Sequence, residues 1–210
     1  MTAKPKEKKT SMTTIVLPKP RHKSKMSLEE AFLKRRSVRA YKEDALSQNE
    51  VSNLLWAAQG ITSSDGLRTA ASAGARYPLE AYLVVGNVED ITPGVYKYDP
   101  VKHSLTMRKK GDLRGKLTTA AHGQGMIQEA PVSVVLAAVY ERTTSKYEGR
   151  GVRYVHNDVG HAGQNICLQA VALGLGSVVV GAFEDDDVHN VLDLANDERP
   201  LYIMPVGKAR

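Results

Sequence analysis

Three arginines and a serine stand close together near the start of the chain, in the order Arg35-Arg36-Ser37-Val38-Arg39. A guanidinium group offers planar, paired donors that match the oxygens of a phosphate, and the serine hydroxyl adds a further donor. The segment is therefore a candidate site for an anion. The alternative is that basic residues at the end of a helix complement the helix dipole. The segment alone does not decide between the two.

Two further segments are rich in small residues, which let the backbone pass close to a flat ligand. The first is 68–78, in which Ser72 is a candidate donor to a phosphate or hydroxyl group; the second is 174–183, whose backbone N–H groups could face a redox-active ring. The chain then ends on two more cations, Lys208 and Arg210. The alternatives are a plain loop that ends in a proline turn and a frayed terminus.

Other cofactor and metal signatures are not found in the sequence. No glycine fingerprint opens a strand–helix unit and no phosphate-binding P-loop occurs. No group of ligands has metal spacing, so we predict no metal site. His161 is expected to be a hydrogen-bonded structural histidine, and Cys167 an inert residue of the core.

The elements that must position these residues can be read from capping and hydrophobic periodicity. Ser27 and Ser47 each begin a capping-box pattern, with Glu30 and Glu50 three residues later, which predicts two helices. Further helices are predicted over 112–121 and 153–173. Strands are predicted over 81–85, 94–98, 105–107, 132–139, 177–180 and 201–206. Because strands and helices mix without regular alternation, we expect an α+β fold, a mixed sheet sandwiched by helices.

The composition of the chain indicates its size class, its compartment and its partners. A chain of 210 residues with 42% hydrophobic residues suffices for one sizeable domain. One cysteine and no apolar run of about 20 residues favour a protein of a reducing compartment, the cytoplasm, without a membrane partner.

Residues 1–25 carry eight of the basic residues against Glu7 alone, so the rest of the chain has a net charge of −1. We therefore expect a basic, largely disordered leader over 1–25, a single domain over 26–210, and no nucleic-acid partner. Within the leader, residues 15–18 are apolar enough to dock on the domain or on a partner subunit.

Several blocks of the sequence, taken in order, resemble the SagB-type branch of the nitroreductase family, from about Ile15 to the C-terminus. The blocks are RRSVRAY, LLWAAQGIT, ASAGARYPLEAYLVV, GVYKYDPVKHSL, GQGMIQEAP, KYEGRGVRYVHNDVGHAGQNICLQAVALGLG and VGAF. Two departures stand out: many relatives have proline at Ala71 and glutamate at Asp158.

The resemblance implies an intertwined homodimer with two FMN sites at the subunit interface. It implies that Arg35, Arg36, Ser37 and Arg39 bind the phosphate, the ribityl chain and the pyrimidine edge of FMN. Ser72, Ala73 and Gly74 would come from the other subunit, and Gln124 would lie near the ring. Gly181 and Ala182 would line the ring near N5, and Lys208 and Arg210 would complete the phosphate site.

The activity that the resemblance implies is hydride transfer through flavin N5, between NAD(P)H and a small organic acceptor. A narrower alternative is an azoline dehydrogenase acting on a ribosomal peptide, in which Lys146 and Tyr147 resemble the pair that supplies the base. Lysine acts as a base only where its pKa is lowered, and Lys146 can equally be a solvated loop residue. A non-catalytic flavin-binding module is the other alternative.

Overall fold

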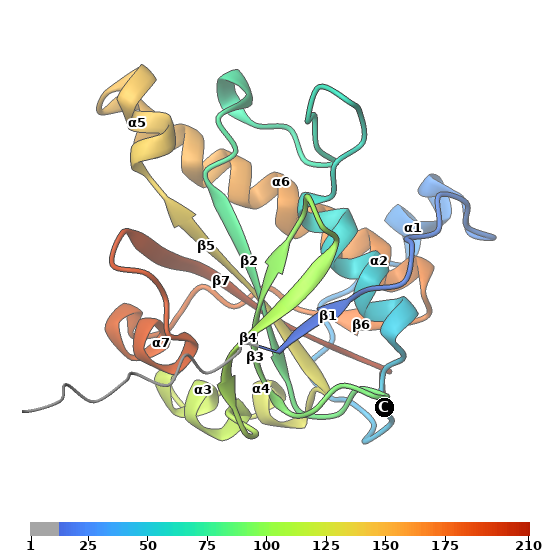
Figure 1. The fold of residues 1–210 in the computed structure, drawn as a ribbon. Helices are drawn as coiled ribbons and strands as arrows, with labels where there is room; N and C mark the ends of the chain where they lie inside the picture. Colours follow the sequence, from blue (N-terminus) through green and yellow to red (C-terminus); the bar gives the residue numbers. More distant parts are fainter. Residues whose placement is uncertain (1–12) are drawn as a thin grey trace, which may run out of the picture.

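The computed structural model describes residues 13–210 as a seven-stranded sheet with helices on both faces (Figure 1). The strand order is β1-β4-β3-β2-β5-β7-β6. The strands are β1 (Thr14–Val16), β2 (Leu79–Val85), β3 (Gly94–Asp99), β4 (Ser104–Lys110), β5 (Val132–Val139), β6 (Gly176–Ser177) and β7 (Glu198–Gly207). The helices are α1 (Leu28–Lys34), α2 (Gln48–Gln59), α3 (Arg114–Ala120), α4 (Met126–Glu129), α5 (Glu141–Tyr147), α6 (Arg150–Ala172) and α7 (Asp185–Leu192). The predicted α+β class is confirmed.

The central strands are buried on both faces because their side chains alternate between two cores. Leu83 and Leu136 pack into the core under α2 and α6, whereas Tyr82 and Val135 pack into the core under α3 and α7. Every pairing between these strands is antiparallel. Parallel pairing is limited to isolated bridges, of which Ser37 with Ser177 bears on the site.

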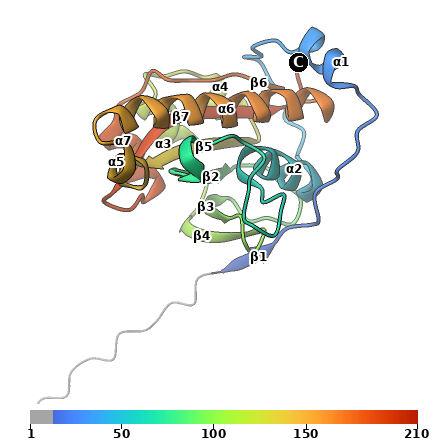
Figure 2. The same ribbon diagram turned by 90° about the horizontal axis from the view of Figure 1, so that it is seen from above.

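The helix caps follow the predicted pattern, one fully and one in part. Ser47 and Glu50 form a reciprocal capping box at the start of α2. At α1, the Ser27 hydroxyl accepts the backbone N–H of Glu30, but the Glu30 carboxylate pairs with Lys34 at 2.5 Å instead. The second view shows that α1 and the C-terminus lie at one end of α6 and α5 at the other (Figure 2).

The start of the described chain differs from the expected disordered leader. Thr14–Val16 form β1 and pair with Thr106–Ser104 of β4, and the Leu17 side chain is buried. The physical reason is the apolar run Ile15-Val16-Leu17, which gains contacts on the sheet that a solvated leader lacks. Residues 13–25 are thus part of the folded structure, while 1–12 lie outside the described residues. No helix within 13–210 is long and apolar enough to cross a membrane.

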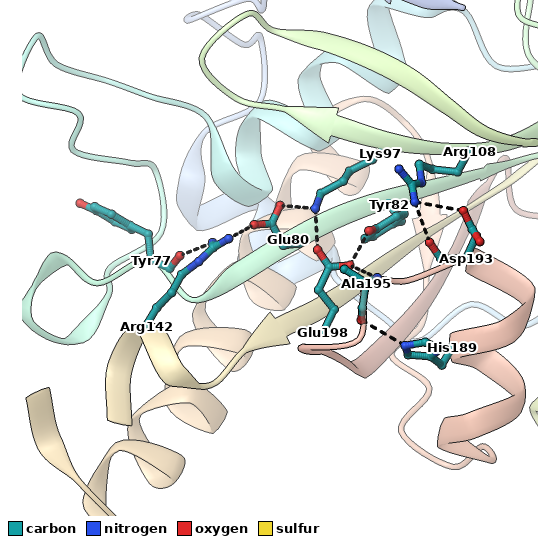
Figure 3. A network of polar contacts seen from close by, with 10 residues as sticks. All are labelled: Tyr77, Glu80, Tyr82, Lys97, Arg108, Arg142, His189, Asp193, Ala195 and Glu198. Atoms are coloured by element: carbon teal, nitrogen blue, oxygen red, sulfur yellow. Dashed lines mark hydrogen bonds and ion pairs between the residues drawn. The ribbon is translucent and has the colours of Figure 1, made fainter. Parts of the chain in front are cut away.

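A polar network lies at the ends of β2, β3 and β7 and joins them to α5 (Figure 3). The Glu198 carboxylate, only 2% exposed, accepts hydrogen bonds from Tyr82 Oη (2.5 Å), Lys97 Nζ (2.5 Å) and the Ala195 N–H (3.1 Å). Lys97 also pairs with Glu80 at 3.2 Å, and Glu80 pairs with Arg142. Every charge in this network has an opposite neighbour, which is the condition under which buried charges are tolerated.

Glu198 should link the stability of the fold to pH. Burial alone would raise the pKa of its carboxyl, but the bonds from Lys97, Tyr82 and Ala195 outweigh burial and lower it. Because the pKa of Glu198 is lower in the folded protein than in the unfolded chain, where it is near 4.5, the carboxylate stabilises the fold at pH values above 4.5. This stability is lost as the pH falls through the folded-state pKa. Glu198→Gln should lower the free energy of unfolding at neutral pH by on the order of 3 kcal/mol and flatten its acid dependence. Urea melts from neutral to acid pH test this, with the exposed Glu89→Gln as control; equal effects of both variants would contradict it.

Candidate functional site

The segment 35–42 carries the predicted anion-binding residues and is held on the β6–β7 end of the sheet. The Val38 N–H donates to the carbonyl of Ser177 at 3.0 Å. Farther along, the Lys42 N–H donates to the Lys208 carbonyl at 2.9 Å, and the Arg210 N–H to the Ala40 carbonyl at 3.2 Å. The structure therefore brings together two predicted segments that are far apart in the sequence, 35–39 and 208–210.

The cations in this cluster differ in whether they already have hydrogen-bond or ion-pair partners within the protein. The Arg36 guanidinium donates to the carbonyls of Leu33 (3.0 Å) and Arg35 (2.7 Å), where it caps the end of α1. This is the structural alternative that the sequence left open for the arginine segment. Arg35 and Arg39 form no ion pair within residues 13–210. These two guanidiniums are therefore the ones available to a ligand.

The two C-terminal cations have weak partners at the surface. Lys208 lies 3.3 Å from Asp44, and both side chains are about half exposed. The Arg210 guanidinium donates to the Tyr41 carbonyl at 3.1 Å and lies 3.8 Å from the Glu129 carboxylate. Exposed pairs of this kind contribute little and exchange readily for another anion. Glu129 is a residue that the sequence did not single out, and no pattern around it points to the site.

Gly181 and Ala182 follow β6 and form an exposed stretch, joined to β7 through the bridge between Val180 and Ile203. Gln124 fixes this stretch, because its side-chain amide donates to the Ala182 carbonyl at 2.9 Å and to the Ala121 carbonyl at 3.0 Å. The backbone N–H groups of Gly181 and Ala182 donate to no other group within the described chain. A side chain added at Gly181 would meet no atom within 4 Å, so the space above this backbone is open. This exposed stretch therefore carries two backbone donors that are unused within the described chain.

The Ser72 loop lies elsewhere, on the N-terminal half of α6. The Ser72 hydroxyl donates to Asp158 at 2.7 Å and accepts the Tyr77 N–H at 2.9 Å, and the Ala73 N–H reaches Asp158 at 3.3 Å. His161 bonds the Ala71 carbonyl at 3.1 Å, in agreement with its predicted structural role. The hydroxyl of Ser72 is thus already used within the chain, so the loop is better suited to bind through its backbone.

Lys146 and Tyr147 lie against this loop, at the end of α5. A Cβ added at Gly74 would stand 2.4 Å from Tyr147 Oη and 3.0 Å from Lys146 Nζ. Gly74 also has φ = +58°, a conformation that glycine adopts without strain. The Tyr147 ring packs edge-on against Tyr154, with ring centroids 5.0 Å apart. The structure therefore assembles a second cluster of predicted residues, which contains Ser72–Gly74, Lys146 and Tyr147.

The two clusters lie at different positions along α6 and do not meet within one chain. The Ser72 loop is bound at Asp158, whereas Cys167 lies near Ser177 and the arginine segment. Nine helical residues separate these contacts, which is about 13 Å along the axis. Burial raises the pKa of the Cys167 thiol, in keeping with the inert role predicted for it. Figure 2 shows α5 and α1 at opposite ends of α6.

Asp158 is the residue on which the Ser72 loop depends. Asp158→Ala removes the acceptor for two donors, the Ser72 hydroxyl and the Ala73 N–H, and should lower the free energy of unfolding by about 1–3 kcal/mol. Thermal melts measure this loss, with the exposed neighbour Asn157→Ala as control. An Asp158→Ala melt that coincides with the wild-type melt would show that the loop does not need this carboxylate. The sequence marked Asp158 as a departure from relatives, but its contact with Ser72 is visible only in the folded structure.

Comparison with known proteins agrees with this architecture. The model of the family described as "Nitroreductase family" matches residues 32–208. A protein of Methanocaldococcus jannaschii named as a nitroreductase, MJ1384, is 46% identical over 183 residues, which are 87% of this chain and 91% of that protein. A nitroreductase crystal structure from Ralstonia eutropha superposes with a TM-score of 0.83 at 29% identity, covering 94% of this chain and 90% of that one.

Two more distant structures share the fold. A chain of the Escherichia coli microcin synthetase McbBCD complex with truncated pro-MccB17 matches with a TM-score of 0.72 at 23% identity, covering 93% of this chain and 78% of that one. The NADPH:FMN oxidoreductase of Vibrio harveyi in complex with NAD+ matches with a TM-score of 0.64 at 18% identity, covering 87% and 68%. The matching family model and the archaeal relative each extend over most of the chain. The chain therefore belongs to the nitroreductase family.

Proposed function

We propose that the protein is an FMN-dependent oxidoreductase that transfers hydride between NAD(P)H and a small organic acceptor, and that it works as a homodimer. The observation that carries the proposal is the cluster at the β6–β7 end of the sheet. There the segment of Arg35 and Arg39 is joined by backbone hydrogen bonds to Ser177 and to the C-terminal residues, and the exposed stretch at Gly181 follows Ser177 in the chain. The NADPH:FMN oxidoreductase of Vibrio harveyi, whose name states both compounds, shares the fold.

The residues of this cluster fit the parts of FMN. Arg35 and Arg39, with Lys208 and Arg210, would hold the phosphate, because guanidinium groups match its oxygens and no carboxylate pairs with the first two within residues 13–210. Bound FMN would supply hydride transfer at its ring nitrogen N5. The unused N–H groups of Gly181 and Ala182 would face that nitrogen, held in place by Gln124. A fixed backbone donor favours negative charge developing at its acceptor.

In the proposed dimer, each site would take parts from both subunits. The Ser72–Gly74 loop with Lys146 and Tyr147 is bound at Asp158, about 13 Å along α6 from Cys167, and the loop of the second subunit would complete the site at the cation cluster. The described surface carries apolar side chains that suit such an interface. On α1 they are Leu28, Phe32 and Leu33, which are 57%, 54% and 73% exposed, and on α6 Val152 is 41% exposed. Exposed apolar patches of this kind commonly mark contacts between proteins.

The test is an absorbance spectrum of the purified protein, before and after NADPH and then NADH without oxygen. Flavin bands that bleach with either donor are the expected result. Bands that persist with both donors would rule out NAD(P)H as the electron source. A protein that shows no flavin bands after incubation with FMN would overturn the cofactor assignment itself.

A second candidate, the azoline dehydrogenase, is favoured by the contact of Lys146 and Tyr147 with Gly74. Both side chains end within about 3 Å of the point where a Cβ on Gly74 would lie, so a base would stand at the wall of the completed site. Oxidation of a thiazoline would transfer a hydride to the cofactor and a proton to Lys146. A thiazoline-containing peptide should then bleach the flavin of the wild type without NAD(P)H, and of Lys146→Met at least tenfold more slowly. No bleaching by the peptide would exclude this candidate.

A further inference from the structure

A hollow of about 490 Å³ lies away from the residues assigned above, between the segment 21–25, α2 and the last turns of α6. Its lining is Arg21, His22, Lys23, Ser24, Lys25, Asn53, Trp56, Gln169, Ala172 and Leu173. Pockets that hold small ligands have volumes of about 300–1,000 Å³. The hollow is thus of the right size for a small molecule.

All the charged side chains that line the hollow are positive. Arg21, Lys23 and Lys25 contribute three cations, and no carboxylate lines the hollow. None of the three forms an ion pair within the described part of the chain. The end of α6 offers a structural reason for positive charge, because it has no basic residue in its last turn. A helix end is equivalent to only about half a negative charge, so three cations exceed what α6 requires.

The cationic segment is fixed in place rather than trailing over the surface. The Ser52 hydroxyl donates to the Pro18 carbonyl at 2.6 Å, and the Arg21 N–H donates to Asn53 Oδ1 at 3.0 Å. The Met26 N–H then bonds the Ser24 hydroxyl at 3.1 Å, just before α1 begins. The segment is thus anchored to α2 at Arg21 and continues into α1, and its three cations lie along one wall of the hollow.

An aromatic pair from the segment 21–25 and α2 lines the hollow. The His22 ring stacks on the Trp56 indole, with ring centroids 5.1 Å apart and an angle of 28° between the planes. His22 thus covers this face of the indole, and because the His22 side chain is itself exposed, an aromatic base would stack on the outer face of the pair. The amide groups of Asn53 and Gln169 add polar contacts at the edge of the hollow.

We infer that this hollow is a binding site for a nucleoside monophosphate, separate from the proposed flavin site. The base would stack on the Trp56–His22 pair and the phosphate would bind Arg21, Lys23 and Lys25. An arginine and two lysines match a phosphate dianion in charge and donor geometry. The site would let the protein sense or position a nucleotide through a segment that precedes α1.

The experiment titrates AMP into the full-length, FMN-loaded protein and follows tryptophan emission. Trp56 is the only tryptophan of the chain, so the signal reports on this hollow. We expect saturable quenching, with adenosine at least tenfold weaker. Arg21→Ala/Lys23→Ala/Lys25→Ala should weaken AMP binding at least tenfold. The matched control Lys109→Ala/Lys110→Ala/Lys116→Ala removes three cations that line another hollow and should change it less than twofold.

Several outcomes would overturn the inference. These are no saturable response to AMP in emission or calorimetry, equal losses in both triple variants, and a response to a single-stranded oligonucleotide without one to AMP. Displacement of flavin by AMP, seen as a change in the flavin bands, would place AMP in the flavin site instead. Because AMP does not reduce flavin, a failure here stays distinct from a failure of the proposed oxidoreductase activity.

Discussion

The Arg35→Ala/Arg39→Ala variant should emerge from purification without flavin colour, whereas the wild type should be yellow. Both residues belong to the segment whose backbone bonds Ser177 and the C-terminal residues, and neither is paired with a carboxylate in the described chain. Each charge-assisted hydrogen bond to a phosphate is worth about a factor of ten or more in affinity. The double variant should therefore bind FMN roughly a hundredfold or more weakly. Quenching of flavin fluorescence on titration with FMN measures this affinity.

Arg36→Ala is the matched control for that experiment. Its guanidinium already donates hydrogen bonds to the carbonyls of Leu33 and Arg35, so its loss should loosen the end of α1 more than it weakens FMN binding. An Arg36→Ala variant that loses flavin while the double variant keeps it would reverse the roles assigned to these arginines. The sequence alone favoured Arg36 as much as its neighbours, since a sequence does not show which guanidinium is used for capping.

Mixing two inactive variants should restore part of the flavin binding. Arg35→Ala/Arg39→Ala damages the cation cluster, and Gly74→Val damages the loop, because valine tolerates φ = +58° poorly and would strike Tyr147. If each site draws on both subunits, a mixed dimer has one intact site and one doubly damaged site. Random pairing at equal amounts then restores about a quarter of the wild-type sites.

The measurement is flavin stoichiometry after the two variants are unfolded together and refolded. Each variant refolded alone sets the background, and light scattering verifies that the products are dimers. Recovery no greater than the mean of the two backgrounds would mean that each site is built within a single chain. The proposed dimeric site would then be wrong, even if the protein binds FMN.

Much of the fold follows from local signals in the sequence. The Ser47–Glu50 capping box, the hairpin of β3 and β4 and the continuous apolar run of β5 all form as predicted. These elements depend on neighbours in sequence, which patterns describe well. By contrast, the strand predicted over 177–180 is reduced to Gly176–Ser177, followed by a single bridge at Val180. Its Val179 is 39% exposed, so β-branched residues alone overstate the strand.

The site was harder to predict than the fold because its residues have competing partners. Nothing local shows that the Ser72 hydroxyl is taken by Asp158, 86 positions away. The same holds for Arg210, whose neighbour Glu129 belongs to α4, far away in the sequence. Motif order singles out the candidate segments, but which of their atoms remain available to a ligand depends on tertiary contacts. The groups now expected to bind the ligand are Arg35, Arg39 and the backbone N–H groups at Gly181. Arg36 and Ser72 are not, because other groups of the chain already bond their side chains.

The short strand β1 has a consequence for how this protein should be handled in solution. It covers Ser104–Thr106 of β4, while the uncovered remainder of that strand carries Arg108, Lys109 and Lys110. An edge without such charges pairs readily with other molecules, and lysine is a common protection against it. Removal of residues 1–17 would bare an uncharged stretch of backbone donors and acceptors. Such a truncated protein should self-associate through that edge and precipitate, so affinity tags and solubility screens should leave the first strand intact.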